Sequence, residues 1–118
     1  MKITEQEAFD RMVNHLRKQG KKSVHEITRT CLYRHPDGLK CAVGALIPDE
    51  LYKPDFETRT ASDVFKLSTH LNSLFVHDIY LLLDRMQEIH DFAEPHHWEE
   101  RFKEVAEDYY LRYTENTV

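Results

Sequence analysis

Two cysteines and a nearby histidine could together bind a metal ion. Cys31, His35 and Cys41 offer the thiolate and imidazole ligands that tetrahedral zinc sites most often use. Further imidazoles that could complete the set come from the second half of the chain: His77, His90, His96 and His97. Structural zinc sites usually pair ligands about two to four residues apart, whereas nine residues separate the two cysteines. The spacing favours cysteines that pack as small buried groups without a cofactor, and zinc binding is the alternative.

A second interpretation makes Cys41 a nucleophile. It precedes a run of small residues that could open a helix, and the N-terminal dipole of a helix lowers the pKa of a thiol. His90 and Asp91 could then act as the general base and as the carboxylate that orients it. Nothing in the spacing brings these residues together, and a histidine at a helix end is also favoured simply by the helix dipole. A small zinc- or thiol-dependent enzyme using Cys41 and His90 is therefore the alternative function, and a non-enzymatic protein is the favoured one.

The charges are distributed unevenly along the chain. The net charge is −5, but residues 11–40 carry eight Lys or Arg against two acidic residues, a net +6, whereas residues 41–118 carry seven against sixteen, a net −9. Such a chain can present one basic and one acidic surface. Because it is acidic overall and has no recognisable nucleic-acid motif, a protein is favoured over a nucleic acid as its partner. The residues expected to carry binding are Lys18, Lys21, Lys22, Glu100, Glu104 and Glu107.

Hydrophobic periodicity predicts helices at both ends of the chain. Thr4 and Glu7 fit a capping box, an apolar stripe follows, and Gly20 suits the left-handed position after a helix, which predicts a helix over residues 5–19. Pro95 could open a last helix whose apolar stripe begins at Trp98. Between them, the pattern from residue 62 to residue 93 predicts two helices or one kinked helix, with a break at 72–73 or 77–78.

The helical pattern is missing between these regions. The turn sequence His35-Pro-Asp-Gly38 lies between two short apolar runs and predicts a small β-hairpin near residues 31–43. Residues 41–47 are the most apolar stretch and are expected in the core, whereas residues 53–61 are expected to form a surface loop. The predicted fold is mainly α, bordering on α+β, with three to five helices around one core. We expect a single domain spanning residues 1–118.

The start of the chain gives an expectation for location. Its first residues lack the basic start and apolar run of a signal peptide, and no apolar stretch approaches the ~18 residues of a membrane span. Two cysteines also do not make the disulfide framework of a small secreted protein. We therefore expect a cytoplasmic protein with no membrane partner.

Three stretches of the chain carry a recognisable pattern: Cys31-Leu-Tyr-Arg34, Gly38-Leu-Lys-Cys41-Ala-Val-Gly44-Ala-Leu-Ile-Pro-Asp-Glu-Leu-Tyr52, and Ile89-His-Asp91 with Trp98. In them the chain resembles a group of small proteins from bacteriophages and prophage-bearing bacteria, and the resemblance spans most of the chain. The group has no established activity, so the resemblance implies a setting rather than a reaction. One departure is Ala45, a position that is often Cys in the group, and this weakens a zinc site.

The setting that the resemblance implies is the cytoplasm of a host cell. Small phage accessory proteins often bind and redirect a host protein, including host defence enzymes. Together with the uneven charge, this favours a non-enzymatic protein that binds a host protein through its charged surface.

Overall fold

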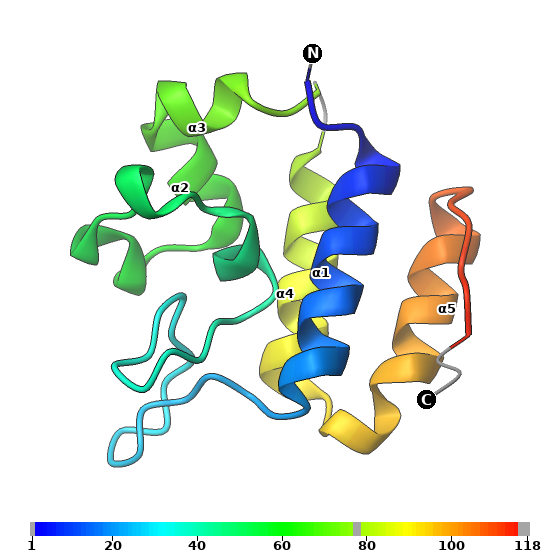
Figure 1. Ribbon diagram of the computed structural model, residues 1–118, viewed down its shortest axis with the longest axis horizontal. Coiled ribbons are helices and arrows are strands. Elements are labelled where there is room, and N and C mark those ends of the chain that lie inside the picture. Colours follow the sequence, from blue (N-terminus) through cyan, green and yellow to red (C-terminus); the bar gives the residue numbers. More distant parts are fainter. Residues whose placement is uncertain (1, 77–78, 116–118) are drawn as a thin grey trace.

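The computed structural model describes residues 2–76 and 79–115 and is mainly α-helical, as predicted. Within these residues the five α-helices are α1 (Glu5–Gln19), α2 (Ala61–Leu67), α3 (Thr69–Ser73), α4 (Tyr80–Phe92) and α5 (Trp98–Asp108). Short 3₁₀ helices cover Val43–Leu46, Asp49–Leu51, Pro54–Thr58 and Pro95–His97. Figure 1 shows α1, α4 and α5 side by side, with α2 and α3 on the other side of α4.

The first helix forms where the sequence predicts it. The Thr4 hydroxyl accepts the Glu7 amide at 3.1 Å, and the Glu7 carboxylate accepts the Thr4 amide at 3.2 Å, which is the reciprocal pair of a capping box. Gly20 ends the helix with a φ of 70°, a left-handed conformation that glycine adopts at little cost. Local signals at both ends therefore fix α1, and the prediction is confirmed.

The core lies between α1, α4 and the short helices next to them. The 3₁₀ helix Val43–Leu46 contacts both α1 and α4, which confirms the prediction that the apolar run 41–47 belongs to the core. On its other sides α4 packs against α2 and α5. Its buried apolar side chains are Leu82, Leu83, Met86 and Ile89.

The helical stretch before α4 is divided further than predicted. Ser68 separates α2 from α3, and its side chain caps α3 by accepting the Leu71 amide at 3.2 Å. The predicted break at 72–73 falls at the end of α3, whereas the predicted break at 77–78 lies outside the described residues. Pro95 opens a 3₁₀ turn that leads directly into α5.

The predicted hairpin at residues 31–43, all of which the structure describes, is not formed. Its turn is present, since the His35 amide donates to the Leu39 carbonyl at 2.9 Å, but no strands flank it. Cys31 instead pairs with Val24 in one isolated antiparallel bridge. The hairpin prediction was wrong because the earlier, polar segment supplies the pairing partner, while the apolar run after the turn becomes a 3₁₀ helix.

Residues 53–61, expected as a plain surface loop, contain the 3₁₀ helix Pro54–Thr58. Its Phe56 is buried in the core and contacts the Tyr52 ring edge to face, with 6.0 Å between the ring centroids. This anchor fixes the position of the neighbouring residue Glu57.

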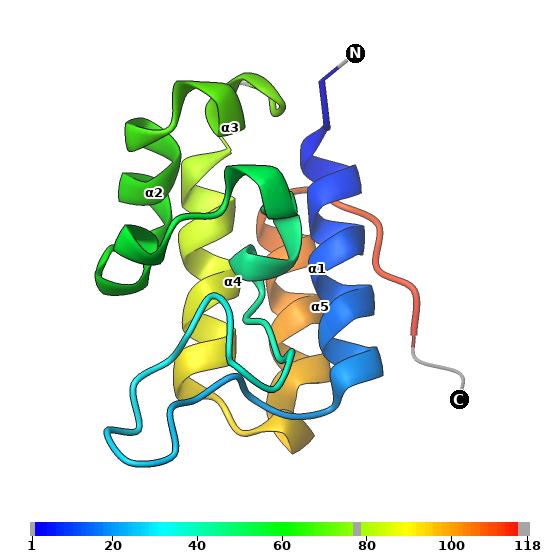
Figure 2. The same cartoon turned by 60° about the vertical axis from the view of Figure 1, so that its left-hand side comes forward.

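The segment after α5 returns along α1, as Figure 2 shows. Arg17 donates to both carboxylate oxygens of Glu99, at 2.8 and 2.6 Å, and to the Thr114 carbonyl at 2.7 Å. The Tyr113 hydroxyl also donates to Glu99, at 2.6 Å. The Arg17 hydrogen bond lowers the pKa of the Glu99 carboxyl. Among the described residues, no helix is long and apolar enough to span a membrane.

Candidate functional site

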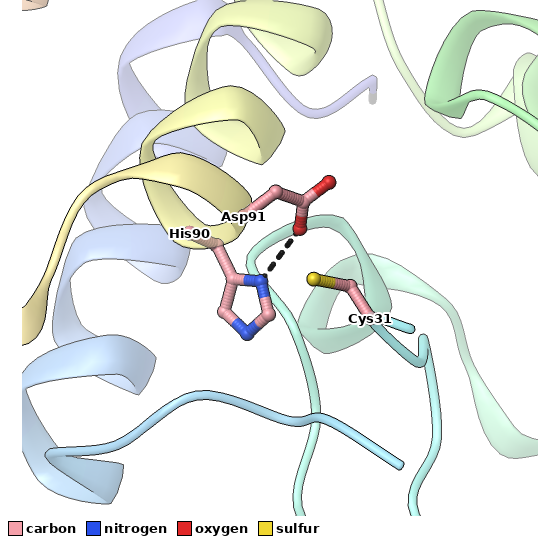
Figure 3. Close-up of side chains that lie close together, drawn as sticks. All are labelled: Cys31, His90 and Asp91. Carbon is pink, nitrogen blue, oxygen red and sulfur yellow. Dashed lines mark hydrogen bonds and ion pairs between the residues drawn. The ribbon is translucent and has the colours of Figure 1, made fainter. Parts of the chain in front are cut away.

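A thiol, an imidazole and a carboxylate come together at the C-terminal end of α4. Figure 3 shows His90 and Asp91 on the last turn of that helix, with the Cys31 side chain approaching from residues 20–42, which connect α1 to the core 3₁₀ helix and which we call the loop segment. One ligand atom of each residue lies within 4.8 Å of the other two. Sequence analysis paired His90 and Asp91 with Cys41, but the thiol that joins them is that of Cys31. We call these three residues the Cys31 cluster.

The hydrogen bonds of His90 fix which of its nitrogens carries a proton. The Ser23 amide donates to Nε2 at 2.9 Å, and because a backbone N–H can only donate, Nε2 has no proton. The proton is therefore on Nδ1, which lies 2.8 Å from Oδ1 of Asp91 and donates to it. The ring is fully buried and stacks near Trp98, with 6.2 Å between the ring centroids. Both nitrogens are thus used inside the protein.

Asp91 collects hydrogen-bond donors from three directions. Besides His90, the side-chain amide of Gln87 donates to its Oδ1 at 2.9 Å. Burial, and next a hydrogen bond to this carboxylate, raise the pKa of the Cys31 thiol to about 12. Gln87 in turn accepts the Val43 amide at 3.1 Å. The network connects the loop segment and the core 3₁₀ helix to α4, and it keeps the Cys31 thiol protonated near neutral pH.

The Cys31 cluster has the ligand types of a zinc site but the wrong protonation pattern. Zinc binding would need a thiolate at Cys31 and a free electron pair on Nδ1 of His90. The imidazole proton would then move to Nε2, where it would face the Ser23 amide, and two donors would oppose each other. The groups present therefore fit a hydrogen-bonded network better than a metal ion.

The predicted metal set of Cys31, His35 and Cys41 is not brought together. His35 is buried in its turn, with Nε2 at 2.8 Å from the Glu26 carboxylate and Nδ1 accepting the Asp37 amide at 3.0 Å. Within residues 2–76 and 79–115, the possible metal-ligand groups are the Cys31 cluster and this acidic group around His35. The alternative zinc set is thus not assembled, because His35 finds its hydrogen-bond partners among the residues of its own turn and Glu26.

Cys41, the candidate nucleophile of the alternative interpretation, is a core residue. It is fully buried, and its sulfur accepts the Gly44 amide at 3.3 Å. Burial raises the pKa of its thiol to about 12, which is opposite to the lowered value that a nucleophile needs. Of the other histidines considered, His96 and His97 lie in the 3₁₀ turn before α5, and His77 lies outside the described residues.

Glu57 is a second carboxylate hub, which sequence reasoning missed. Its two oxygens accept the backbone amides of Tyr33 and Arg34 at 2.8 and 3.1 Å, and the Tyr52 hydroxyl donates to it at 2.5 Å. Arg34 then donates to the Ile47 carbonyl at 2.6 Å and stacks over the Tyr52 ring at 4.9 Å. Glu57 carried no local signal, because the two backbone amides that it binds lie more than twenty residues earlier.

Gly44 belongs to the same arrangement. A Cβ atom at this position would lie 2.2 Å from the Tyr33 carbonyl oxygen, so the backbone of the core 3₁₀ helix can approach the Tyr33 segment only without a side chain. Several residues that carry the resemblance thus have direct packing roles: Tyr33, Arg34, Cys41, Gly44 and Tyr52.

The Cys31 cluster borders an open cleft of about 550 Å³ between α4 and the loops. Cys31, Tyr33 and Asp91 line it, together with the charged residues Arg59 and Asp84. A ligand in this cleft could contact the thiol of Cys31 and the carboxylate of Asp91. Comparison with known proteins found no matching family model, curated protein or solved structure.

The predicted binding residues differ in how accessible they are. Lys18 and Lys21 are exposed, but the Lys22 side chain is only 20% exposed, with its Nζ at 3.4 Å from the Asp91 carbonyl and 3.7 Å from the Glu94 carboxylate. Lys22 therefore contacts the end of α4 beside the Cys31 cluster and is less accessible to a partner than Lys18 and Lys21. The remaining predicted residues are exposed on α5: Glu100, Glu104 and Glu107.

Proposed function

We propose that this chain is a small accessory protein of the phage type that binds a host protein without catalysing a reaction. Its place is the host cytoplasm, and inhibition of a host defence system is the role that such binding would serve. The observation that carries the proposal is that the three candidate reactive groups are occupied inside the protein. The thiols of Cys31 and Cys41 both have a raised pKa, and both nitrogens of His90 form hydrogen bonds within the chain. A nucleophile or a metal ligand needs an available deprotonated atom.

The exposed charges of α5 support binding as the alternative to catalysis. Glu100, Glu104 and Glu107 follow one another at i, i+4 and i+7, a spacing that places them on one face of the helix. Within the described residues, Glu104 pairs with Arg101 at 3.2 Å and Glu100 lies 3.8 Å from the His97 imidazole, and both contacts are exposed. Carboxylates on such a face attract a basic partner surface and speed its association.

The test is capture of a host protein from bacterial cytoplasm by the tagged protein, followed by salt titration. Binding should weaken as the salt concentration rises above physiological strength, where exposed charges are screened beyond about 8 Å. Reversing Glu100, Glu104 and Glu107 to Lys should slow association most, and reversing Lys18 and Lys21 tests the basic end of α1. Lys22 is left unchanged because it is partly buried.

A matched control reverses Glu50 and Asp55, which are exposed on the short 3₁₀ helices. It should bind like the wild type. The alternative, a small thiol- or zinc-dependent enzyme, is favoured only by the position of the Cys31 cluster beside a cleft. We would abandon the binding proposal if Cys31→Ser or Cys41→Ser, confirmed folded, abolished function while both charge-reversed variants kept it.

A further inference from the structure

Two large apolar side chains stand exposed on the same face of α4. Leu81 is 69% exposed and Phe92 is 82% exposed, whereas the opposite face of the helix is buried in the core. With Arg85 and Glu88 between them, they follow the spacing i, i+4, i+7 and i+11, so the four side chains form one stripe. We call this stripe the α4 ridge. Its length is roughly 16 Å, or about three helical turns, at 1.5 Å per residue.

The α4 ridge has a hollow on each side. One is the cleft of about 550 Å³ next to the Cys31 cluster, and the other, of about 440 Å³, lies between α4 and α5. Glu88 and Phe92 line both hollows, and Ile89 and Ala93 add apolar surface to the second. An exposed aromatic between two hollows can insert into a partner while partner side chains fill the hollows, which is the arrangement of interface hot spots.

The net negative charge around the α4 ridge favours a partner with basic side chains. The linings of the two hollows together hold six acidic and four basic residues, a net −2. Arg85 is already paired with Asp108 at 3.0 Å, and Arg101 with Glu104 at 3.2 Å. Glu88 is exposed, and within the part of the chain that the structure describes it makes no ion pair. A partner cation would therefore find an acceptor beside Phe92.

We propose that the α4 ridge is the docking site for an amphipathic helix of a partner protein, one that carries Lys or Arg next to its apolar side chains. Its apolar face packs against Leu81 and Phe92, side chains enter the two hollows, and a cation pairs with Glu88. This inference rests on the proposed function and names the contact surface, which adjoins the acidic face of α5 because Glu104 of that face lines the hollow between the two helices.

The experiment uses a labelled synthetic helix of leucine and lysine with amphipathic spacing, and fluorescence anisotropy measures its binding to the full chain. Phe92→Ala should weaken binding by at least about tenfold, because truncation of a central aromatic anchor typically has such an effect. Tyr110→Ala is the matched control, since Tyr110 is 96% exposed outside the ridge. Glu88→Lys should weaken binding strongly, whereas Glu50→Lys, also an exposed glutamate, should not.

Two further peptides separate a specific site from simple charge attraction. A peptide with Glu in place of Lys should not bind, and a scrambled peptide without amphipathic spacing should bind at least about tenfold more weakly. Equal binding of the leucine–lysine helix to the wild type, Phe92→Ala and Glu88→Lys would refute the ridge as the docking site, as would its failure to bind the wild type. If host-protein capture still depended on the α5 charges, only this inference would fail. Loss of capture altogether would refute the proposed function.

Discussion

Replacing His90 by Ala should destabilise the protein by roughly 3–5 kcal/mol. The substitution leaves the Ser23 amide without its acceptor in a buried position, which costs about 1–3 kcal/mol. The carboxylate of Asp91 loses its Nδ1 donor but keeps Gln87. The cavity left by the fully buried ring contributes roughly 2 kcal/mol more. Since domains of this size unfold at a cost of about 5–15 kcal/mol, the loss is a large part of the total.

Urea unfolding followed by circular dichroism measures this loss, and the melting temperature should fall by roughly 10–20 °C. The matched control is His97→Ala, because the His97 side chain is 54% exposed and its nearest charged partner is Glu100 at 3.8 Å. That variant should stay within about 0.5 kcal/mol of the wild type. If His90→Ala unfolded within about 1 kcal/mol of the wild type, the hydrogen-bonded network would not be the reason for this buried histidine, and a chemical role would regain support.

Four other perturbations test separate parts of the structure. Gly44→Ala should cost about 3 kcal/mol or more in urea unfolding, because the new Cβ would lie 2.2 Å from the Tyr33 carbonyl oxygen; an unchanged midpoint would mean that the two segments are not in contact. Burial lowers the pKa of His15 below its ordinary 6.5, so the unfolded chain binds the extra proton first and stability should fall as the pH decreases from 6.5; His15→Gln should flatten part of this slope. Glu99→Gln removes the negative charge and one of the two acceptor oxygens of the ion pair with α1 and should cost about 1 kcal/mol near pH 7. Because the pKa of this carboxyl is lowered on folding, the difference from the wild type should shrink as the pH falls below 4.5. The Cys31 cluster should hold well under one zinc per chain and the fold should survive a chelator; elemental analysis showing one tightly bound zinc, with unfolding on its removal, would contradict this.

Elements with complete local signals could be predicted from the sequence. α1 has a capping box at Thr4, an apolar stripe and a left-handed glycine at Gly20. Each of these sequence signals lies within a few residues of the helix end or helix face that it determines. The same holds for α5, where Pro95 precedes an apolar stripe. The pairing of His90 with Asp91 could also be predicted from the sequence, because the two residues are adjacent.

The contacts that the sequence could not predict join segments far apart in the chain. The thiol near Asp91 belongs to Cys31, about sixty residues away, and the pairing of Cys31 with Val24 depends on where the loop packs against α4. Glu57 had no pattern at all. Gln87 had one, because it lies four residues before Asp91 on a helix and such pairs face each other.

Several residues that carry the resemblance make their hydrogen bonds and packing contacts inside the molecule. Arg34 binds a backbone carbonyl and covers a tyrosine ring, Gly44 allows two backbones to meet, and Cys41 is sealed in the core. His90 accepts the Ser23 amide of the loop segment at Nε2 and donates from Nδ1 to its neighbour Asp91 on α4. A pattern made of such residues specifies how residues 21–60 fold over α4, and under the proposed function the choice of partner falls to side chains outside it. Phe92 is of that kind, since it follows the pattern directly in sequence and stands exposed, which is why we expect specificity to reside on the α4 ridge.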